Sequence, residues 1–306
     1  MKYPPPSIGC IIPTYNAKHH LSRCLEPLLK SSLKPRILVI DSSSNDGTVE
    51  IAQIVGAEVF VIPKSCFNHG ATRELARKIL NTEIICMLTQ DAYLTDALAL
   101  EALISPLIAK QAKIAYARQI PHKGAKFFEA FPRYYNYPEK SQLRGIEDCS
   151  TFGAYTFFCS DSCAAYVNEA LDQVGGFDTV LLGEDTLATA KILRRGHKIA
   201  YCADATVHHS HRYSLKEEFC RCFDTGFARK KHASLINCGS SDTKRGASYA
   251  KAMVVQLIKT APWLIPYAII QTVVKWTGYR IGSLSLHAPN WFKKALSSQK
   301  YYWDEK

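Results

Sequence analysis

Short apolar runs alternate with longer amphipathic stretches over roughly the first third of the chain. Runs rich in β-branched residues predict strands at 8–12, 36–40, 58–62, 83–88 and 113–117. Stretches with helical spacing predict helices near 18–31, 48–55, 71–80 and 96–109. Because strands that alternate with helices are typical of βαβ units, the sequence predicts an α/β fold with a doubly wound, mostly parallel sheet.

Polar residues follow three of these predicted strands, and they form the segments Pro13-Thr14-Tyr15-Asn16, Asp41 to Gly47 and Thr89-Gln90-Asp91. The carboxyl ends of parallel strands meet at one edge of a sheet, so the three loops predict a single ligand crevice. Asp41 could accept a hydrogen bond from a pyrimidine base on which Tyr15 stacks. Asp91 could hold Mg²⁺ or Mn²⁺ against a diphosphate. Turn chemistry, with Asp46 as a helix cap, is the alternative for the second loop.

Two further segments offer ligands for a cation or a phosphate. In an extended chain, His209 and His211 lie on one face, where either could join Asp91 as a metal ligand, although histidine-rich strands are often incidental. Gly70 opens a predicted helix that places His69 and Arg73 one turn apart, which suits a phosphate at a helix N-terminus. The alternative for this second segment is a helix cap with a solvated arginine.

The acidic pair Glu184-Asp185 follows Gly183 and precedes a predicted helix at 186–196. A carboxylate in this setting is expected to be fixed and poised ionised, as a general base for a hydroxyl must be. The alternative is that Asp185 only caps its helix. A second pair, Glu147-Asp148, lies in a polar stretch and is interpreted as a surface or acceptor-loop feature. Asp161 and Asp178 are lesser candidates for the base.

Residues 120–150 show no clear period and are expected to form a long, irregular excursion that faces an acceptor. The chain carries eleven cysteines without paired metal-type spacing, which favours reduced thiols in a cytosolic compartment. The first residues resemble no export signal, so we expect the protein to stay in the cytoplasm.

The net charge of +11 is concentrated at the C-terminal end, where residues 215–306 hold 15 Lys and Arg against 6 Asp and Glu. Within this segment, the apolar run 260–274 lies between Lys259 and Lys275 and is shorter than the roughly 20 residues that span a bilayer. Flanking Trp263 and Trp276 suit a segment that lies in the headgroup region of an anionic membrane. A buried helix pair with a solvated basic face is the alternative. No dense basic run points to nucleic acid.

Seven segments together resemble family 2 inverting glycosyltransferases of the A-type fold, especially bacterial rhamnosyltransferase-like members. They occur in the family's order: Pro13 to Asn16, Asp41 to Thr48, Phe67 to Arg73, Thr89 to Ala92, Gly175 to Asp178, Gly183 to Asp185 and His209 to Tyr213. The resemblance covers about residues 7–303 and extends to Phe223 to Phe227 and Gly278 to Gly282.

The resemblance implies a role for each of these positions. The implied nucleotide site consists of Pro13, Tyr15, Asn16, Asp41 and Asp46, with His69 and Arg73 toward the base or diphosphate. Asp91 matches the last acid of the family's Asp-x-Asp metal motif, whereas Thr89 replaces the first, which puts metal dependence in question. His209 or His211 would be the later metal ligand, Asp185 the base, and Glu184 and Gln90 supporting residues.

We therefore expect a nucleotide-sugar-binding half at 1–119, an acceptor-binding and catalytic half at 120–213, and a basic helical extension at 214–306. The expected reaction transfers a sugar, rhamnose from dTDP-rhamnose by family likeness, onto a lipid-linked saccharide in surface polysaccharide assembly. The expected location is the inner face of the cytoplasmic membrane. The alternatives are a UDP-hexose donor or a catalytically inactive nucleotide-binding scaffold on the membrane.

Overall fold

The structure is a computed structural model that describes residues 5–238 and 242–304. Strands β1 (Ile8–Thr14), β2 (Arg36–Asp41), β3 (Glu58–Val61) and β4 (Ile84–Leu88) are parallel neighbours in the order β3-β2-β1-β4. Helices α1 (Lys18–Leu29), α2 (Thr48–Ile54) and α3 (His69–Leu80) connect them, and α4 (Ala99–Ile108) leads to β6 (Ile114–Ile120). All five strands and all four helices predicted between residues 8 and 117 are confirmed, with shifts at their ends.

The second half of the sheet is mixed. Strand β8 (Cys163–Val167) is antiparallel to both of its neighbours, β4 and β6. Strand β9 (Ile199–His208) is parallel to β6, and the short strands β5 (Tyr93–Leu94) and β7 (Gln142–Arg144) pair with β9 in the antiparallel sense. The sequence did not predict β8, which inserts between strands that are distant from it along the chain.

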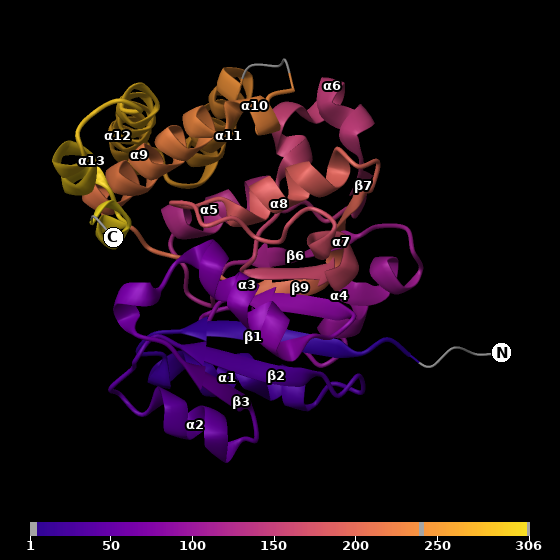
Figure 1. Cartoon of the computed structure of the whole chain (residues 1–306). Helices are drawn as coiled ribbons and strands as arrows, with labels where there is room; N and C mark the ends of the chain where they lie inside the picture. The colour runs from indigo at the N-terminus through magenta and orange to yellow at the C-terminus, as the bar shows by residue number, and fades with distance from the viewer. Residues whose placement is uncertain (1–4, 239–241, 305–306) are drawn as a thin grey trace.

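Helices cover both faces of the sheet (Figure 1). Along β1, Cys10 and Ile12 pack in one core with α1 and α4, whereas Ile11 packs in the other with α3 and α8 (Glu184–Leu193). Side chains on a strand alternate between faces, so an apolar run such as 8–12 supplies both cores. The doubly wound arrangement is therefore confirmed, and it leaves the strand ends free to carry a site.

The expectation of an irregular excursion at 120–150 is wrong. This stretch contains α5 (Phe127–Asn136), β7 and the start of α6 (Cys149–Phe152). Pro132 within α5 and a dense set of aromatic residues obscure its helical period. A disulfide joins Cys149 to Cys238, so the expectation of reduced thiols does not hold for this pair.

The C-terminal segment is helical, as predicted, and lies at the opposite end of the molecule from β3 (Figure 1). Helices α9 (Leu215–Lys231) and α12 (Ile265–Leu284) touch backbone to backbone, because a Cβ atom at Gly226 would lie 2.1 Å from the Tyr279 carbonyl oxygen and one at Gly282 would lie 2.0 Å from that of Phe223. The remaining helices are α7 (Asn168–Asp172), α10 (Ala233–Ile236), α11 (Asp242–Thr260) and α13 (Asn290–Leu296), with 3₁₀ turns at Lys64–Cys66, Ile146–Asp148, Gly153–Phe157, Pro262–Leu264 and Lys300–Trp303.

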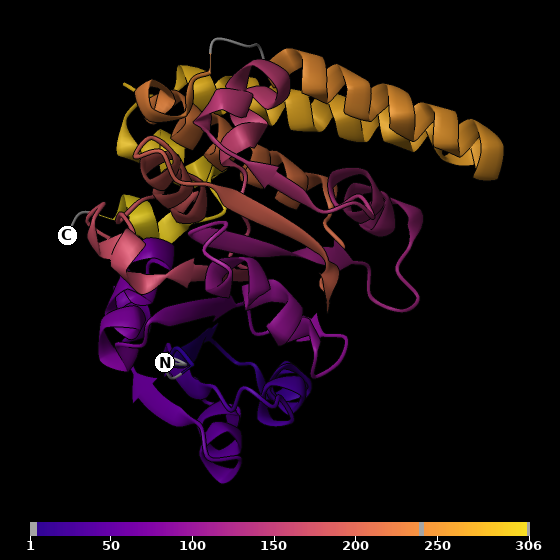
Figure 2. The same cartoon turned by 90° about the vertical axis from the view of Figure 1, so that its right-hand side faces the viewer.

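Helices α11 and α12 form a hairpin that extends beyond the rest of the protein (Figure 2). In the half of the hairpin nearer its turn, Met253, Leu257 and Ala268 form a small core with aromatic side chains of α5. Within the described residues, no helix combines the length and the apolar character that crossing a bilayer requires.

Candidate active site

A cleft of about 1730 Å³ runs from the carboxyl ends of β1 and β4 to the inner faces of α9, α11 and α12. Among the described residues, its lining contains two carboxylates, Asp91 and Asp161, against eight Lys and Arg side chains. A cleft of this charge attracts anionic ligands. Eight of the predicted site residues line it: Pro13, Tyr15, His69, Arg73, Gln90, Asp91, His209 and His211.

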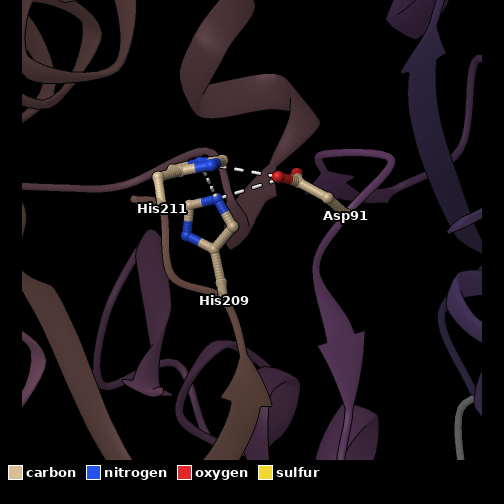
Figure 3. A group of neighbouring side chains, drawn as sticks. All are labelled: Asp91, His209 and His211. Carbon is tan, nitrogen blue, oxygen red and sulfur yellow. Dashed lines mark hydrogen bonds and ion pairs between the residues drawn. The ribbon is translucent and has the colours of Figure 1, made fainter. Parts of the chain in front are cut away.

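Asp91, His209 and His211 converge within this cleft, although they come from two distant parts of the chain (Figure 3). The Nε2 atom of His209 lies 3.7 Å from Asp91 Oδ1, and that of His211 lies 3.5 Å from Asp91 Oδ2. The two Nε2 atoms are 2.9 Å apart. Burial lowers the pKa of both histidines, so at neutral pH each ring is uncharged and offers a lone pair.

These three side chains fit a divalent cation. One carboxylate and two neutral imidazoles form a donor set that transition metals such as Mn²⁺ accept. Two nitrogens each about 2.1 Å from one ion lie about 3 Å apart when their bonds meet at a right angle, and the separation of the Nε2 atoms agrees with this. Thr89 stands where the family's motif has its first acid, and two histidines rather than one lie beside Asp91.

The acidic pair lies directly behind the cleft wall, at the start of α8. Gly183 precedes the helix with φ of +86°, a left-handed conformation that favours glycine. Asp185 is half-buried, and its Oδ2 accepts a hydrogen bond from the backbone N–H of Asp161 at 3.3 Å. Asp161 lines the cleft, so Asp185 lies directly behind a residue that faces the space where an acceptor would bind.

The neighbours of Asp185 correct the expectation that it ionises readily. Burial, followed by the negative charges of Glu184 and Asp161, raises the pKa of Asp185 to about 8. Burial also raises the pKa of Asp161 to about 6. Three carboxylates in so small a space resist simultaneous ionisation, so Asp185 becomes charged only well above the ordinary range of an aspartate.

Arg73 is the positively charged partner of the acidic residues Glu184 and Asp161. Its buried guanidinium lies 3.0 Å from Glu184 and 3.3 Å from Asp161, and it donates a hydrogen bond to the His69 carbonyl. This pairing argues against the contact with a diphosphate that the sequence suggested, because both acids neutralise the guanidinium. Arg73 instead joins α3 to α8, and a Cβ at Gly70 would lie 1.9 Å from the Asp178 carbonyl oxygen, so only glycine permits this close approach.

The other predicted nucleotide residues support the loops rather than line the cleft. Asp41 is fully buried and accepts hydrogen bonds from Thr14 Oγ1 at 2.8 Å and from the backbone N–H of Ser44 at 2.7 Å. Asp46 accepts from the N–H groups of Lys18 and Thr48, and Asn16 accepts from that of Asn45. These bonds tie the loop after β1 to the loop after β2, and a direct contact of Asp41 with a base would require it to exchange partners.

Tyr15 and Gln90 connect the loop after β1 to the loop after β4 at the surface of the cleft. Gln90 Oε1 accepts from the backbone N–H of Tyr15 at 2.8 Å. The Lys64 ammonium lies 4.0 Å from the centroid of the Tyr15 ring and donates to its hydroxyl at 2.7 Å. Tyr15 therefore presents a partly exposed ring beside a positive charge, which suits a base attached to a phosphate.

Several residues that line the cleft are not among those predicted from the sequence. The guanidinium of Arg221 on α9 lies 4.4 Å from the centroid of the Tyr213 ring, which itself packs against His211. The helical spacing of Arg221, Thr225 and Arg229 was the available signal, since all three line the cleft. The rival pair Glu147-Asp148 lies in a short 3₁₀ turn, where Asp148 accepts from the Gly145 N–H and Glu147 contacts Lys198 at 3.4 Å.

Comparison with solved structures shows the same fold. The mannosyltransferase PcManGT from Pyrobaculum calidifontis, in complex with GDP-Man and Mn²⁺, matches with a TM-score of 0.63 and 14% identity over 92% of this chain and 87% of that chain. S. aureus TarS in complex with UDP-GlcNAc matches with a TM-score of 0.54 and 14% identity over 92% of this chain and 91% of that chain. At these identities the likeness shows the glycosyltransferase A-type fold alone.

Relatives in sequence are closer. The O-antigen chain rhamnosyltransferase RfbN of Salmonella typhimurium is 36% identical over 305 residues, which cover 97% of this chain and 96% of that protein. WbaN of Salmonella anatum, which bears the same description, is 34% identical over 98% of this chain and 96% of its own length. Residues 10–175 match the model of glycosyl transferase family 2. The chain therefore belongs to glycosyltransferase family 2 and is a glycosyltransferase similar to O-antigen chain rhamnosyltransferases.

Proposed function

We propose that this enzyme transfers rhamnose from dTDP-rhamnose onto a lipid-linked saccharide during O-antigen assembly, with inversion at the anomeric carbon. The observation that supports the proposal is the basic cleft, because Asp91, His209 and His211 line it and the half-buried Asp185 lies behind its wall in contact with the cleft residue Asp161. The names of the two Salmonella relatives support the choice of sugar and pathway.

In the proposed reaction, Asp185 takes the proton from an acceptor hydroxyl. The hydroxyl oxygen forms a bond to the anomeric carbon as the bond from that carbon to the donor diphosphate breaks, and the electron pair leaves with the diphosphate. Attack from the side opposite the leaving group inverts the anomeric centre. The raised pKa of Asp185 makes it a stronger base than an exposed aspartate once it has ionised.

The donor diphosphate would lie near Asp91, His209 and His211, which would hold Mg²⁺ or Mn²⁺. When bound, such an ion neutralises charge that develops on the leaving diphosphate. Arg221 is the side chain we assign to assist, because it stacks on Tyr213 beside His211 and has no carboxylate partner at ion-pair distance within the described residues. Pro13, Tyr15 and His69 would contact the nucleotide, while Asn16, Asp41 and Asp46 would maintain the shape of its loops.

A panel of nucleotide sugars, offered with a lipid-diphosphate saccharide acceptor and analysed by mass, tests the proposed function. Transfer of a deoxyhexose from dTDP-rhamnose alone supports it. Transfer from a UDP-hexose instead would overturn the donor assignment. Nucleotide binding without transfer to any lipid-linked acceptor would favour the inactive scaffold.

Asp91→Ala tests the cation site separately. The variant is expected to lose the increase in donor affinity that Mn²⁺ gives the unaltered enzyme, because one of three ligands is removed. Calorimetric titration of donor with and without Mn²⁺ measures this increase. Full activity of the unaltered enzyme in excess chelator would show that the reaction needs no cation.

The proposal also places the enzyme on the inner face of the cytoplasmic membrane, where lipid-linked acceptors would meet it. Two features support this placement. Residues 243–303 contain no Asp or Glu against nine Lys and Arg. The α11–α12 hairpin also exposes apolar side chains at its outer end, including Trp263 at 75% and Ile258 at 60%. Basic charge together with exposed apolar side chains is typical of surfaces that lie on anionic membranes.

A further inference from the structure

Gln119, at the end of β6, connects His209, one of the three proposed cation ligands, to helix α5. Its side chain is buried, with 2% exposed. Its Oε1 atom lies 3.0 Å from His209 Nδ1 and accepts a hydrogen bond from Arg133 Nη1 at 2.5 Å. Its Nε2 donates to Ser160 Oγ at 2.9 Å. Each polar atom of this carboxamide therefore has a defined partner.

Arg133 determines which way the carboxamide faces. A guanidinium carries donors alone, so the Gln119 atom that it contacts must be the acceptor oxygen. The same oxygen faces His209 Nδ1, and an oxygen without a hydrogen can only accept there. His209 must then carry its proton on Nδ1, because the neutral ring has a single N–H. The Nε2 atom of His209 then carries the lone pair, and this atom points toward Asp91 and His211 (Figure 3).

We propose that Gln119, oriented by Arg133, is the positioning residue that fixes His209 in the tautomer able to bind a cation. This inference rests on the proposed cation site. Partners of this kind fix the ring orientation and tautomer of metal-binding histidines, and their loss typically weakens metal affinity 10- to 100-fold.

Helix α5 also contacts Ser210, the residue between His209 and His211. Glu129 Oε1 accepts a hydrogen bond from Ser210 Oγ at 2.5 Å, between the two histidines. Arg133 follows Glu129 by one helical turn, so both contacts come from one face of α5. Helix α5, whose sequence predicts an irregular excursion, thus supports the His209–His211 segment at two points.

Substitution of Gln119 tests the inference through cation binding rather than catalysis. For Gln119→Leu, Mn²⁺ affinity measured by electron paramagnetic resonance titration is expected to fall 10- to 100-fold. Gln119→Glu keeps an acceptor for both Arg133 and His209, so its affinity should stay within a few-fold of the unaltered protein. In Arg133→Met the Gln119 carboxamide can rotate so that its oxygen and nitrogen exchange places. Mn²⁺ affinity is therefore expected to fall, as in Gln119→Leu.

Gln142→Leu is a matched control. Gln142 lies on β7, which also pairs with β9, and its Oε1 has no hydrogen-bond partner among the described residues. Its substitution should leave Mn²⁺ affinity unchanged. If Gln119→Leu folds, as judged by circular dichroism, and binds Mn²⁺ as tightly as the unaltered protein, the inference is wrong. An equal loss in Gln142→Leu would also overturn it.

The tautomer of His209 gives a second test that needs neither a variant of Gln119 nor a cation. Two-bond ¹H–¹⁵N spectra of the cation-free protein, assigned with His209→Ala, should show the proton on Nδ1. A proton on Nε2 would overturn the inference even if Mn²⁺ binds. If the unaltered protein binds no Mn²⁺, the proposed cation site fails, and that result is distinguishable because the tautomer is measured separately.

Discussion

Asp185 is the residue on which the proposed chemistry depends most directly. Removal of a general base typically slows a reaction about 10²- to 10⁴-fold, so Asp185→Asn should lower the rate of sugar transfer by that order while donor binding persists. Product formation followed by mass measures the rate. Asp178→Asn is a matched control, because Asp178 lies in the preceding loop and pairs with Lys191. Transfer by Asp185→Asn at the unaltered rate would remove Asp185 from the mechanism.

The pH dependence of transfer should report the environment of Asp185. The base acts in its charged form, and its pKa is raised to about 8, so kcat/KM should increase with pH through that region. Glu184→Gln removes a negative neighbour and leaves Arg73 less neutralised. Both changes favour the charged form of Asp185, lower its pKa and should move the acidic limb to lower pH. A profile that Glu184→Gln leaves unmoved would show that another group controls it.

At the scale of elements, the local pattern of apolar and polar residues was sufficient to predict a helix or strand whose neighbours in the fold are also close in sequence. The βαβ units up to β4 followed from apolar runs and turn residues, and the loops after β1 and β4 supplied Tyr15 and Asp91 as predicted. Strand β8 and helix α5 were missed, since β8 is short and rich in alanine and cysteine, while Pro132 interrupts the pattern of α5. Sequence could not show that Asp161 and Glu184 meet at Arg73, because contacts between distant segments leave no local signal.

The close contact of α9 with α12 should depend on glycine. In Gly282→Ala the added Cβ would meet the Phe223 carbonyl oxygen, so the helices must separate, and the free energy of unfolding should fall by about 1–3 kcal/mol. Gly246→Ala in α11 is the control, since no atom lies within 4 Å of a Cβ there, and alanine is favoured over glycine in a helix by about 0.5–1 kcal/mol. Urea denaturation of both variants measures the difference. Equal stability of the two variants would show that α9 and α12 tolerate a wider spacing.

At the scale of the whole molecule, the cleft and the outer end of the α11–α12 hairpin are different surfaces joined by α5. One face of α5 contacts the cation-site network through Glu129 and Arg133. Its aromatic side chains, among them Phe128 and Phe131, pack against Tyr267 and Tyr249 of the hairpin. Trp263 and Ile258 lie outside the residues that line the cleft within the described part of the chain. Membrane binding and sugar transfer can therefore be separated by substitution at the end of the hairpin.

The double variant Ile258→Gln with Trp263→Gln tests whether this end of the hairpin docks on lipid. Burial of one such side chain contributes about 1.5–3 kcal/mol, so loss of both should weaken binding to vesicles that contain anionic lipid by at least about tenfold. Sedimentation with vesicles measures binding, and a water-soluble acceptor should be glycosylated at the unaltered rate. Trp291→Gln is the control, because Trp291 is equally exposed, at 73%, but lies on α13. Binding of the unaltered protein should also weaken as salt screens its basic residues. If the double variant sediments with vesicles as fully as the unaltered protein, or if Trp291→Gln loses as much, the hairpin is not the docking element.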